Sequence, residues 1–197
     1  MAVAWQLSLL GDGPPRGDPA FAGAERRDLG SGAWVEHVPG WLAGADELFE
    51  AVLTAAPWQA RERPMYDRMV AEPRLTTGEW RDPPAPIPEL GRMLSERYEH
   101  QLTVVSANLY RDGRDSVAWH GDRIGRRTDE TVVALVSLGS PRRFLLRPKG
   151  GGSSLRYVTR PGDLLVLGGT CQRTWEHSVP KVKAAGPRIS VMFREGY

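Results

Sequence analysis

Two segments in the first half of the chain place apolar residues at the spacing of an α-helix. The first covers residues 44–57 and ends before Pro57, and the second covers residues 88–102. Their apolar stripes consist of Leu48, Phe49, Val52 and Leu53 in the first segment and Leu90, Met93, Leu94 and Tyr98 in the second. This spacing predicts one helix in each segment. Residues 57–87 are rich in Pro, Trp and Arg and show no clear period.

From residue 102 onward the apolar residues come in short runs of β-branched and aromatic side chains. Turn sequences rich in Gly, Pro and Asp separate these runs. The runs occupy residues 102–110, 116–120, 131–139, 142–147, 154–159, 163–169 and 188–194. Short strands at regular intervals are typical of a sandwich or barrel, and not of a parallel sheet with alternating helices. We therefore predict a mostly β fold with flanking helices, built on a double-stranded β-helix (jelly roll) of about eight strands.

The length of the chain and one irregular segment predict how the chain is divided. A chain of 197 residues corresponds to about one domain. Residues 11–32 are rich in Gly, Pro and charge, so we expect residues 1–32 to form an irregular arm. Residues 33–197 would then form a single domain, with residues 102–197 as its jelly-roll core.

Composition narrows the class of protein. No apolar run approaches the roughly 20 residues that span a bilayer, and the N-terminal apolar patch lacks the basic residues that open a signal peptide. The only cysteine, Cys171, excludes an internal disulfide and favours a reducing cytoplasm.

Charge is distributed unevenly between the two halves of the chain. Residues 1–110 carry 10 basic and 16 acidic side chains, whereas residues 111–197 carry 16 basic and 8 acidic ones. A basic half is typical of a face that binds a polyanion such as nucleic acid, and equally of a dipolar surface without a partner.

A histidine and an aspartate end one of the predicted strands on the same side. In the sequence VAWHGD at residues 117–122, His120 and Asp122 point the same way because side chains alternate along an extended chain. Such a pair either binds a metal or forms a hydrogen bond on a surface. Downstream, residues 162–180 lead from a strand into a loop that carries His177.

Two histidines and one carboxylate on one side of a metal form the facial triad of non-haem Fe(II) oxygenases, which leaves coordination positions open for other ligands. A structural zinc site would instead use four protein ligands, commonly including thiolates. Cys171 has no CxxC partner, so the sequence favours iron over zinc.

The last predicted strand separates apolar and polar side chains onto two faces. Ile189, Val191 and Phe193 share one face, and the opposite face carries Arg188, Ser190, Met192 and Arg194. The arginines could simply face solvent. However, residues 106–110 also gather polar side chains on one face, which favours a polar interior. A guanidinium in a closed lumen is a natural bidentate receptor for the carboxylate of a 2-oxoacid that chelates iron.

Six short motifs follow one another in the second half of the chain. They are NLY at 108–110, HGD at 120–122, SLG at 137–139, PGDLLVLGG at 161–169, WEHSVP at 175–180 and RISVMFR at 188–194. In this order they resemble the AlkB family of Fe(II)/2-oxoglutarate-dependent dioxygenases. The resemblance covers roughly residues 100–197, and the N-terminal half matches only loosely.

This resemblance implies a catalytic centre in which His120, Asp122 and His177 bind Fe(II). It also implies a site for the co-substrate 2-oxoglutarate, with Arg188 on the distal carboxylate. The residues of that site would be Asn108, Tyr110, Arg188, Ser190 and Arg194. The implied reaction with O2 is oxidative dealkylation, which releases succinate, carbon dioxide and formaldehyde.

For a member that acts on nucleic acid, the resemblance implies 1-methyladenine or 3-methylcytosine in DNA or RNA as the substrate. The base must be flipped out or single-stranded to enter the site. Residues 57–87 would form the nucleotide-recognition lid. Candidate substrate contacts are Trp58, Tyr66, Arg74, Ile124 and Arg156, although Trp58 and Tyr66 could equally cover the helices. Ile124 stands where repair members often carry an acidic residue. An apolar side chain cannot accept a hydrogen bond from the exocyclic amine of a base, so this protein would recognise the base differently.

Two other functions are compatible with the sequence. One is a 2-oxoglutarate dioxygenase of the same fold that acts on a protein side chain or a small molecule. The other is a jelly-roll binding module that keeps a metal for structure. Because the triad and both arginines are present, we favour an enzyme, and we expect it to be a monomer without membrane attachment.

Overall fold

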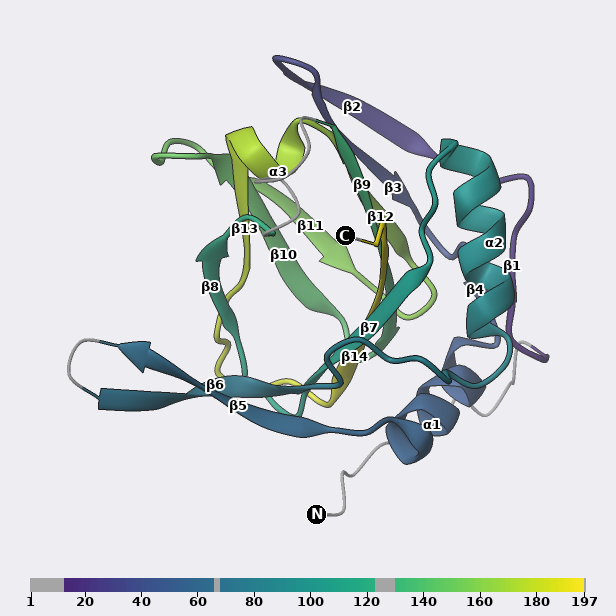
Figure 1. Cartoon of the computed structure of the whole chain (residues 1–197), viewed down its shortest axis with the longest axis horizontal. Helices are drawn as coiled ribbons and strands as arrows, with labels where there is room; N and C mark the ends of the chain where they lie inside the picture. The colour runs from purple at the N-terminus through teal and green to yellow at the C-terminus, as the bar shows by residue number, and fades with distance from the viewer. Residues whose placement is uncertain (1–12, 66–67, 123–129, 197) are drawn as a thin grey trace.

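The computed structural model describes residues 13–65, 68–122 and 130–196, and its centre is a jelly roll of eight antiparallel strands (Figure 1). These strands are β7 (Val104–Tyr110), β8 (Val117–His120), β9 (Thr131–Gly139), β10 (Arg142–Pro148), β11 (Leu155–Thr159), β12 (Leu164–Gly169), β13 (Trp175–Val179) and β14 (Arg188–Arg194). The eight strands are divided between two sheets: β12, β9, β14 and β7 lie in the large sheet, and β11, β10, β13 and β8 lie in the small one. The predicted double-stranded β-helix is confirmed.

Four further strands extend the large sheet to the order β2-β3-β12-β9-β14-β7-β6-β5. They are β2 (Glu25–Gly30), β3 (Ala33–Val38), β5 (Gln59–Met65) and β6 (Arg68–Thr76). Two short strands, β1 (Arg16–Gly17) and β4 (Leu42–Ala43), pair with each other.

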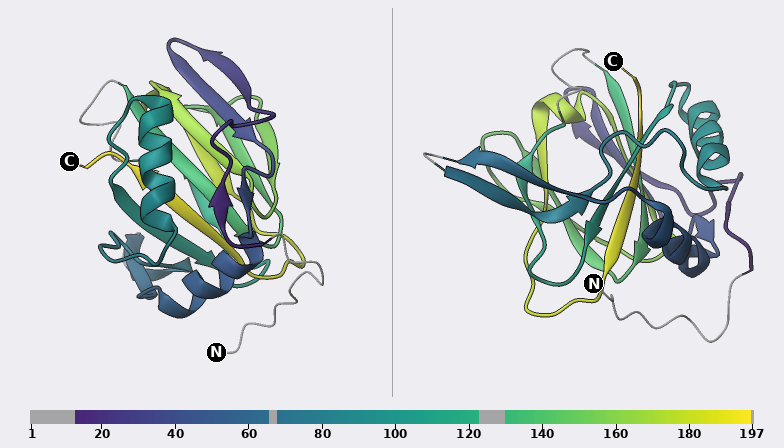
Figure 2. Two further views of the ribbon diagram at one scale, coloured as in Figure 1. Left: turned by 90° about the vertical axis from the view of Figure 1, so that its right-hand side faces the viewer. Right: turned by 60° about the horizontal axis from the view of Figure 1, so that its bottom comes forward.

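Some of these strands occupy segments that were expected to be irregular. Residues 25–30 of the predicted arm form β2, and the aperiodic segment 57–87 contains the β5–β6 hairpin, which projects from the body of the protein (Figures 1 and 2). Residues 1–12 of the arm lie outside the described residues. The β2 side chains are almost all exposed, as are residues 59–62 of β5. Edge strands held mainly by backbone hydrogen bonds need no apolar alternation, so the sequence carried no signal for them.

The two predicted helices are α1 (Ala45–Ala55) and α2 (Ile87–Tyr98), and both cover the outer face of the large sheet (Figure 2). Most of the predicted stripe residues are buried, and Leu48, Phe49, Leu90 and Leu94 are almost inaccessible to solvent. Leu53 and Met93 are only partly buried. A third, short helix, α3 (Cys171–Thr174), precedes β13. No helix in the described parts of the chain has both the length and the apolarity needed to cross a membrane.

The large sheet separates two hydrophobic cores. The first lies between the sheet and the helices and includes Ile189, Val191 and Phe193 of β14. The second lies between the two sheets and includes Tyr110, Phe144 and partly buried Met192. The apolar face of β14 is therefore turned toward the helices, and its polar face is turned toward the space between the sheets.

Gly168 of β12 provides a test of the packing between β12 and Trp34 of the neighbouring strand β3. A Cβ atom at Gly168 would overlap the ring of Trp34, which is stacked on Tyr98 and covered by Arg26. We expect Gly168→Ala to lower the free energy of unfolding by about 1–3 kcal/mol, the usual cost of overpacking, in urea titrations. Gly196→Ala is the control, because its nearest neighbour would lie 3.7 Å from the new Cβ. Equal stability of both variants would contradict this account of Trp34.

Candidate metal centre

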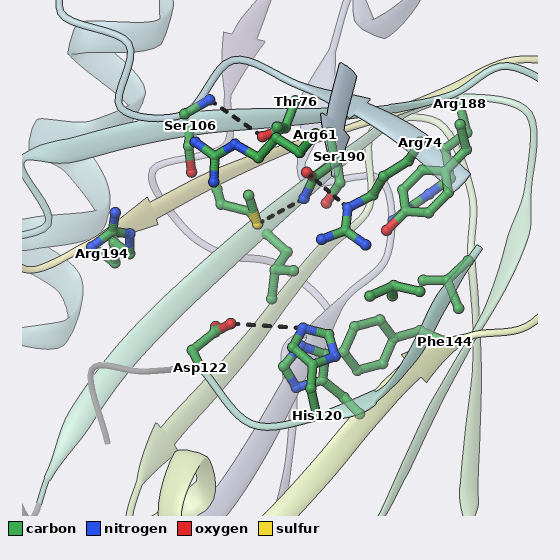
Figure 3. A pocket seen from close by; sticks show the side chains of 18 of the residues that line it. Arg61, Arg74, Thr76, Ser106, His120, Asp122, Phe144, Arg188, Ser190 and Arg194 are labelled. Carbon is green, nitrogen blue, oxygen red and sulfur yellow. Dashed lines mark hydrogen bonds and ion pairs between the residues drawn. The ribbon is translucent and has the colours of Figure 1, made fainter. Parts of the chain in front are cut away.

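Three potential metal ligands converge on one edge of the space between the sheets (Figure 3). His120 ends β8, Asp122 follows two residues later, and His177 lies opposite His120 in the β8–β13 pair. One ligand atom from each side chain lies within 4.8 Å of the others. His177 was expected in a loop, but it lies on strand β13, where β8 and β10 pair with it on either side.

The imidazole rings are arranged so that nitrogen lone pairs are available. His120 Nδ1 lies 2.8 Å from the carbonyl oxygen of Ala118. Because a carbonyl oxygen only accepts, Nδ1 carries a proton, and Nε2 is the nitrogen that faces Asp122, 3.9 Å from its Oδ1. Burial lowers the pKa of His177 to about 4, and its ring stacks on Phe144. His177 is therefore neutral at pH 7, as metal ligation requires.

The triad opens onto a cavity of about 230 Å³ between the two sheets. The triad residues come from the small sheet and the segment after β8, and the facing wall comes from β7 and β14 of the large sheet. All five residues that the resemblance assigned to the co-substrate line this cavity. They are Asn108, Tyr110, Arg188, Ser190 and Arg194 (the two arginines and Ser190 are labelled in Figure 3).

Arg188 is a buried cation without a carboxylate partner among the described residues. It is 2% exposed, and its Nη2 donates to Ser137 Oγ at 2.9 Å and to Thr159 Oγ1 at 3.4 Å. Its Nε has no hydrogen-bond partner in the described part of the chain, and its guanidinium lies 5.3 Å from the centre of the Tyr110 ring. Burial lowers the pKa of Arg188. A desolvated guanidinium with an unused donor is suited to bind an anion.

Neighbouring residues complete the same wall of the cavity. In the β7–β14 pair, Tyr110 lies opposite Arg188, and Asn108 lies opposite Ser190. The hydroxyl of Ser190 is buried and has no hydrogen-bond partner among the residues that are described. Arg194 lies at the other end of β14 and also lines the cavity.

Of the candidate substrate contacts that the structure describes, one lines the cavity and two do not. Arg74 of β6 lines the cavity, donates from Nε to Asn108 Oδ1 at 3.2 Å and pairs with Glu72. Trp58 instead packs against the core under the helices, and its Nε1 donates to the Leu53 carbonyl oxygen. Arg156 is exposed on β11 and does not line the cavity. Tyr66 and Ile124 lie outside the described residues.

Three residues that the sequence analysis did not single out also belong to this region. Arg61 of β5 lines the cavity, and so does Phe144 of β10. The inward position of Phe144 follows from the alternation in RRFLLR, so the sequence did contain a signal for it. Gln172 of α3 accepts a hydrogen bond from the backbone N–H of Asp122. The sequence contained no signal for this contact, because α3 is too short to show a helical period.

Comparison with known proteins agrees with this geometry. Residues 41–194 match the model of the 2OG-Fe(II) oxygenase superfamily. The chain is 32% identical over 180 residues to the alpha-ketoglutarate-dependent dioxygenase alkB homolog 3 of Bos taurus, which covers 79% of this chain. It belongs to the AlkB family of this superfamily.

Other members of the AlkB family are also similar to the chain. The DNA oxidative demethylase ALKBH2 of Arabidopsis thaliana is 32% identical over 151 residues, which cover 61% of this chain and 46% of that protein. The chain spans 63% of the length of the Bos taurus relative. The solved structure of OsALKBH1 shares the fold, with a TM-score of 0.60 at 15% identity, over 87% of this chain and 100% of that one.

The family implies Fe(II), 2-oxoglutarate and O2, and the residues present fit these groups. The triad supplies two neutral imidazoles and a carboxylate, a donor set that suits Fe(II). The unused donors of Arg188 and Ser190 suit a carboxylate. Cys171 is not part of the triad cluster, and burial raises the pKa of its thiol to about 12. A thiolate zinc site therefore has no support from the described residues.

Arg188 provides a test of the anion receptor. Because it is a buried cation without a carboxylate partner, we expect Arg188→Met to leave the melting temperature of the ligand-free protein unchanged or raised. The variant would lose two charge-assisted hydrogen bonds to the carboxylate, which contribute about 3–6 kcal/mol to the binding free energy. We therefore expect it to bind 2-oxoglutarate at least about 100-fold more weakly than the parent protein.

The measurement is the rise in melting temperature on adding 2-oxoglutarate with Mn²⁺. Arg156→Met, at an exposed arginine outside the cavity, should keep the rise of the parent protein. A full thermal response in Arg188→Met would show that the carboxylate is bound elsewhere.

Proposed function

We propose that the chain is an Fe(II)/2-oxoglutarate-dependent demethylase that removes N-alkyl lesions from nucleic acid. The substrates would be bases such as 1-methyladenine or 3-methylcytosine in DNA, with RNA as the alternative polymer, and formaldehyde would be released. One observation carries this proposal: the triad and the buried guanidinium of Arg188 face one cavity from two different sheets.

Each part of the cavity has a separate task in this reaction. The iron, when bound to His120, Asp122 and His177, would supply the oxidation of the alkyl carbon by O2 coupled to decarboxylation of 2-oxoglutarate. Arg188 would hold the distal carboxylate and so fix the orientation of the co-substrate. Phe144 packs on His177 and helps to exclude water from this side of the centre.

The nucleic-acid part of the proposal rests on the relatives and on two arginines of the hairpin that line the cavity. A relative named as a DNA oxidative demethylase is 32% identical to this chain. Arg61 and Arg74, both on the β5–β6 hairpin, line the cavity. A base can reach such a cavity only when it is flipped out or single-stranded, and the two arginines would contact its flanking phosphates.

We assign the role of nucleotide lid to the β5–β6 hairpin within residues 57–87. Trp58 contributes core packing to this segment, and Tyr66 is kept as a proposed stacking residue. Arg156 and Ile124 are kept as proposed contacts with substrate. We further propose a monomer in a reducing cytoplasm, in agreement with the single buried cysteine.

The central test is a turnover assay on a synthetic oligonucleotide that contains one 3-methylcytosine. With iron, ascorbate and 2-oxoglutarate, mass spectrometry should detect loss of one methyl group, together with succinate and formaldehyde. Asp122→Ala and His177→Ala should each reduce the rate at least about 100-fold, since metal ligation is lost, while circular dichroism stays that of the parent. Succinate formation with the methyl group retained on DNA and RNA would favour a protein or small-molecule substrate instead.

Arg61 and Arg74 provide a test of the proposed phosphate contacts that does not depend on turnover. Each phosphate contact to a single strand contributes about 0.7 to the slope of log affinity against log salt. We expect the double variant Arg61→Gln/Arg74→Gln to reduce the magnitude of the slope by about 0.7–1.4 in fluorescence titrations with an unmodified oligonucleotide.

Arg92→Gln serves as the control for that titration, because Arg92 is exposed on α2, away from the cavity. The control should keep the slope of the parent protein. A slope that changes equally in the control and in the double variant would remove the hairpin arginines from the phosphate contacts.

A further inference from the structure

Gln172 contacts the backbone of the triad residue Asp122, and the proposed function assigns it no role. It belongs to the short helix α3, between the large-sheet strand β12 and the triad strand β13. Its side chain is almost completely buried, with 5% of the residue exposed. It is also part of the wall of a second hollow, of about 530 Å³, that shares His120 and Asp122 with the cavity.

The side chain of Gln172 binds the backbone of the metal-ligand candidate Asp122. The backbone N–H of Asp122 donates to Gln172 Oε1 at 2.9 Å. Since a backbone N–H can only donate, the oxygen of the amide must face Asp122, and its NH2 group must point the other way. The direction of this amide is therefore fixed by the residue that carries the carboxylate.

The main chain of the same residue constrains the turn between His120 and Asp122. A Cβ atom at Gly121 would lie 2.6 Å from the carbonyl oxygen of Gln172. The turn can approach α3 this closely only because residue 121 is glycine. Gln172 thus contacts the turn twice, once through its side chain and once through its backbone.

The amide is not explained by stability alone. Its Nε2 is buried and has no hydrogen-bond partner among the described residues. A buried N–H group that stays unpaired is unfavourable, and an apolar side chain of similar length would remove that defect. An amide at position 172 is explained if its role is to hold the backbone of Asp122.

We propose that Gln172 is a positioning residue for the metal centre: it holds the 120–122 turn so that Asp122 stays in line with His120 and His177. The inference rests on the proposed function only in that the triad binds a metal. Residues that orient metal ligands typically change metal affinity by about 10–100-fold when they are removed.

The experiment measures binding of Mn²⁺ and Co²⁺ alone, without nucleic acid or turnover. We expect Gln172→Met to bind both ions about 10–100-fold more weakly and to alter the visible absorption of bound Co²⁺, which reports ligand geometry. The melting temperature of the metal-free variant should stay within about 3 °C of the parent, because the lost hydrogen bond is offset by removal of the unpaired N–H.

Two further variants separate positioning from a structural role. Gln172→Glu keeps an acceptor for the Asp122 N–H, so it should restore metal affinity to within about threefold of the parent. Thr131→Val is a matched control, because the Thr131 hydroxyl is also buried without a partner in the described residues and lines neither hollow. It should bind Mn²⁺ as the parent does.

Parent-like metal affinity in Gln172→Met would overturn the inference, and so would equal losses in Gln172→Met and Thr131→Val. If Gln172→Met does not fold, a tenfold or greater loss of affinity in a folded Gln172→Glu would overturn it as well. A parent protein that binds neither ion would instead contradict the proposed function.

Discussion

Side chains alternate between the two faces of a β-strand, and in β14 this alternation builds both the core and the cavity. Ile189, Val191 and Phe193 are buried against the helices, whereas Arg188 and Ser190 face the other sheet. A slip by one residue would bury the arginines under the helices and turn three apolar side chains toward the cavity. The apolar core therefore fixes the register that keeps Arg188 and Ser190 opposite the triad.

The two sheets contribute different chemistry to one site. The small sheet and the segment after it supply the triad, and the large sheet supplies a buried guanidinium whose Nε has no partner among the described residues. Desolvation of that cation is unfavourable while it has no anionic partner, so we expect a bound carboxylate to remove part of this cost. The arginines of the cavity are thus suited to a negatively charged ligand.

The sequence predicted the parts of the structure that have a strong period or a specific spacing. The helical stripes, the two faces of β14 and the pair His120–Asp122 are of this kind. It did not predict β2 or the β5–β6 hairpin, because exposed edge strands have no apolar alternation. The same limit applies to His177, where pairing with β8 and β10 decides that a polar segment is a strand. For Trp58 the sequence suggested a functional role that the structure does not support. This aromatic residue was expected in the lid, but it packs against the core because α1 ends beside it.

One amide connects the hairpin to the wall of the cavity. Arg74 of β6 donates to Asn108 Oδ1, while Asn108 Nδ2 faces the sulfur of Met192 on β14. Among the described residues, the β6–β7 ladder joins Leu75 to Leu109 and Thr76 to Asn108, so this contact lies at the base of the hairpin. Asn108 therefore touches both β6, a strand of the proposed lid, and β14, the strand that carries Arg188. The ion pair of Arg74 with Glu72 offsets a positive charge beside a cavity that already contains Arg188 and Arg194. The hairpin and the β14 wall of the cavity thus share Asn108, so the direction of the proposed lid is tied to a residue that we propose to face the co-substrate.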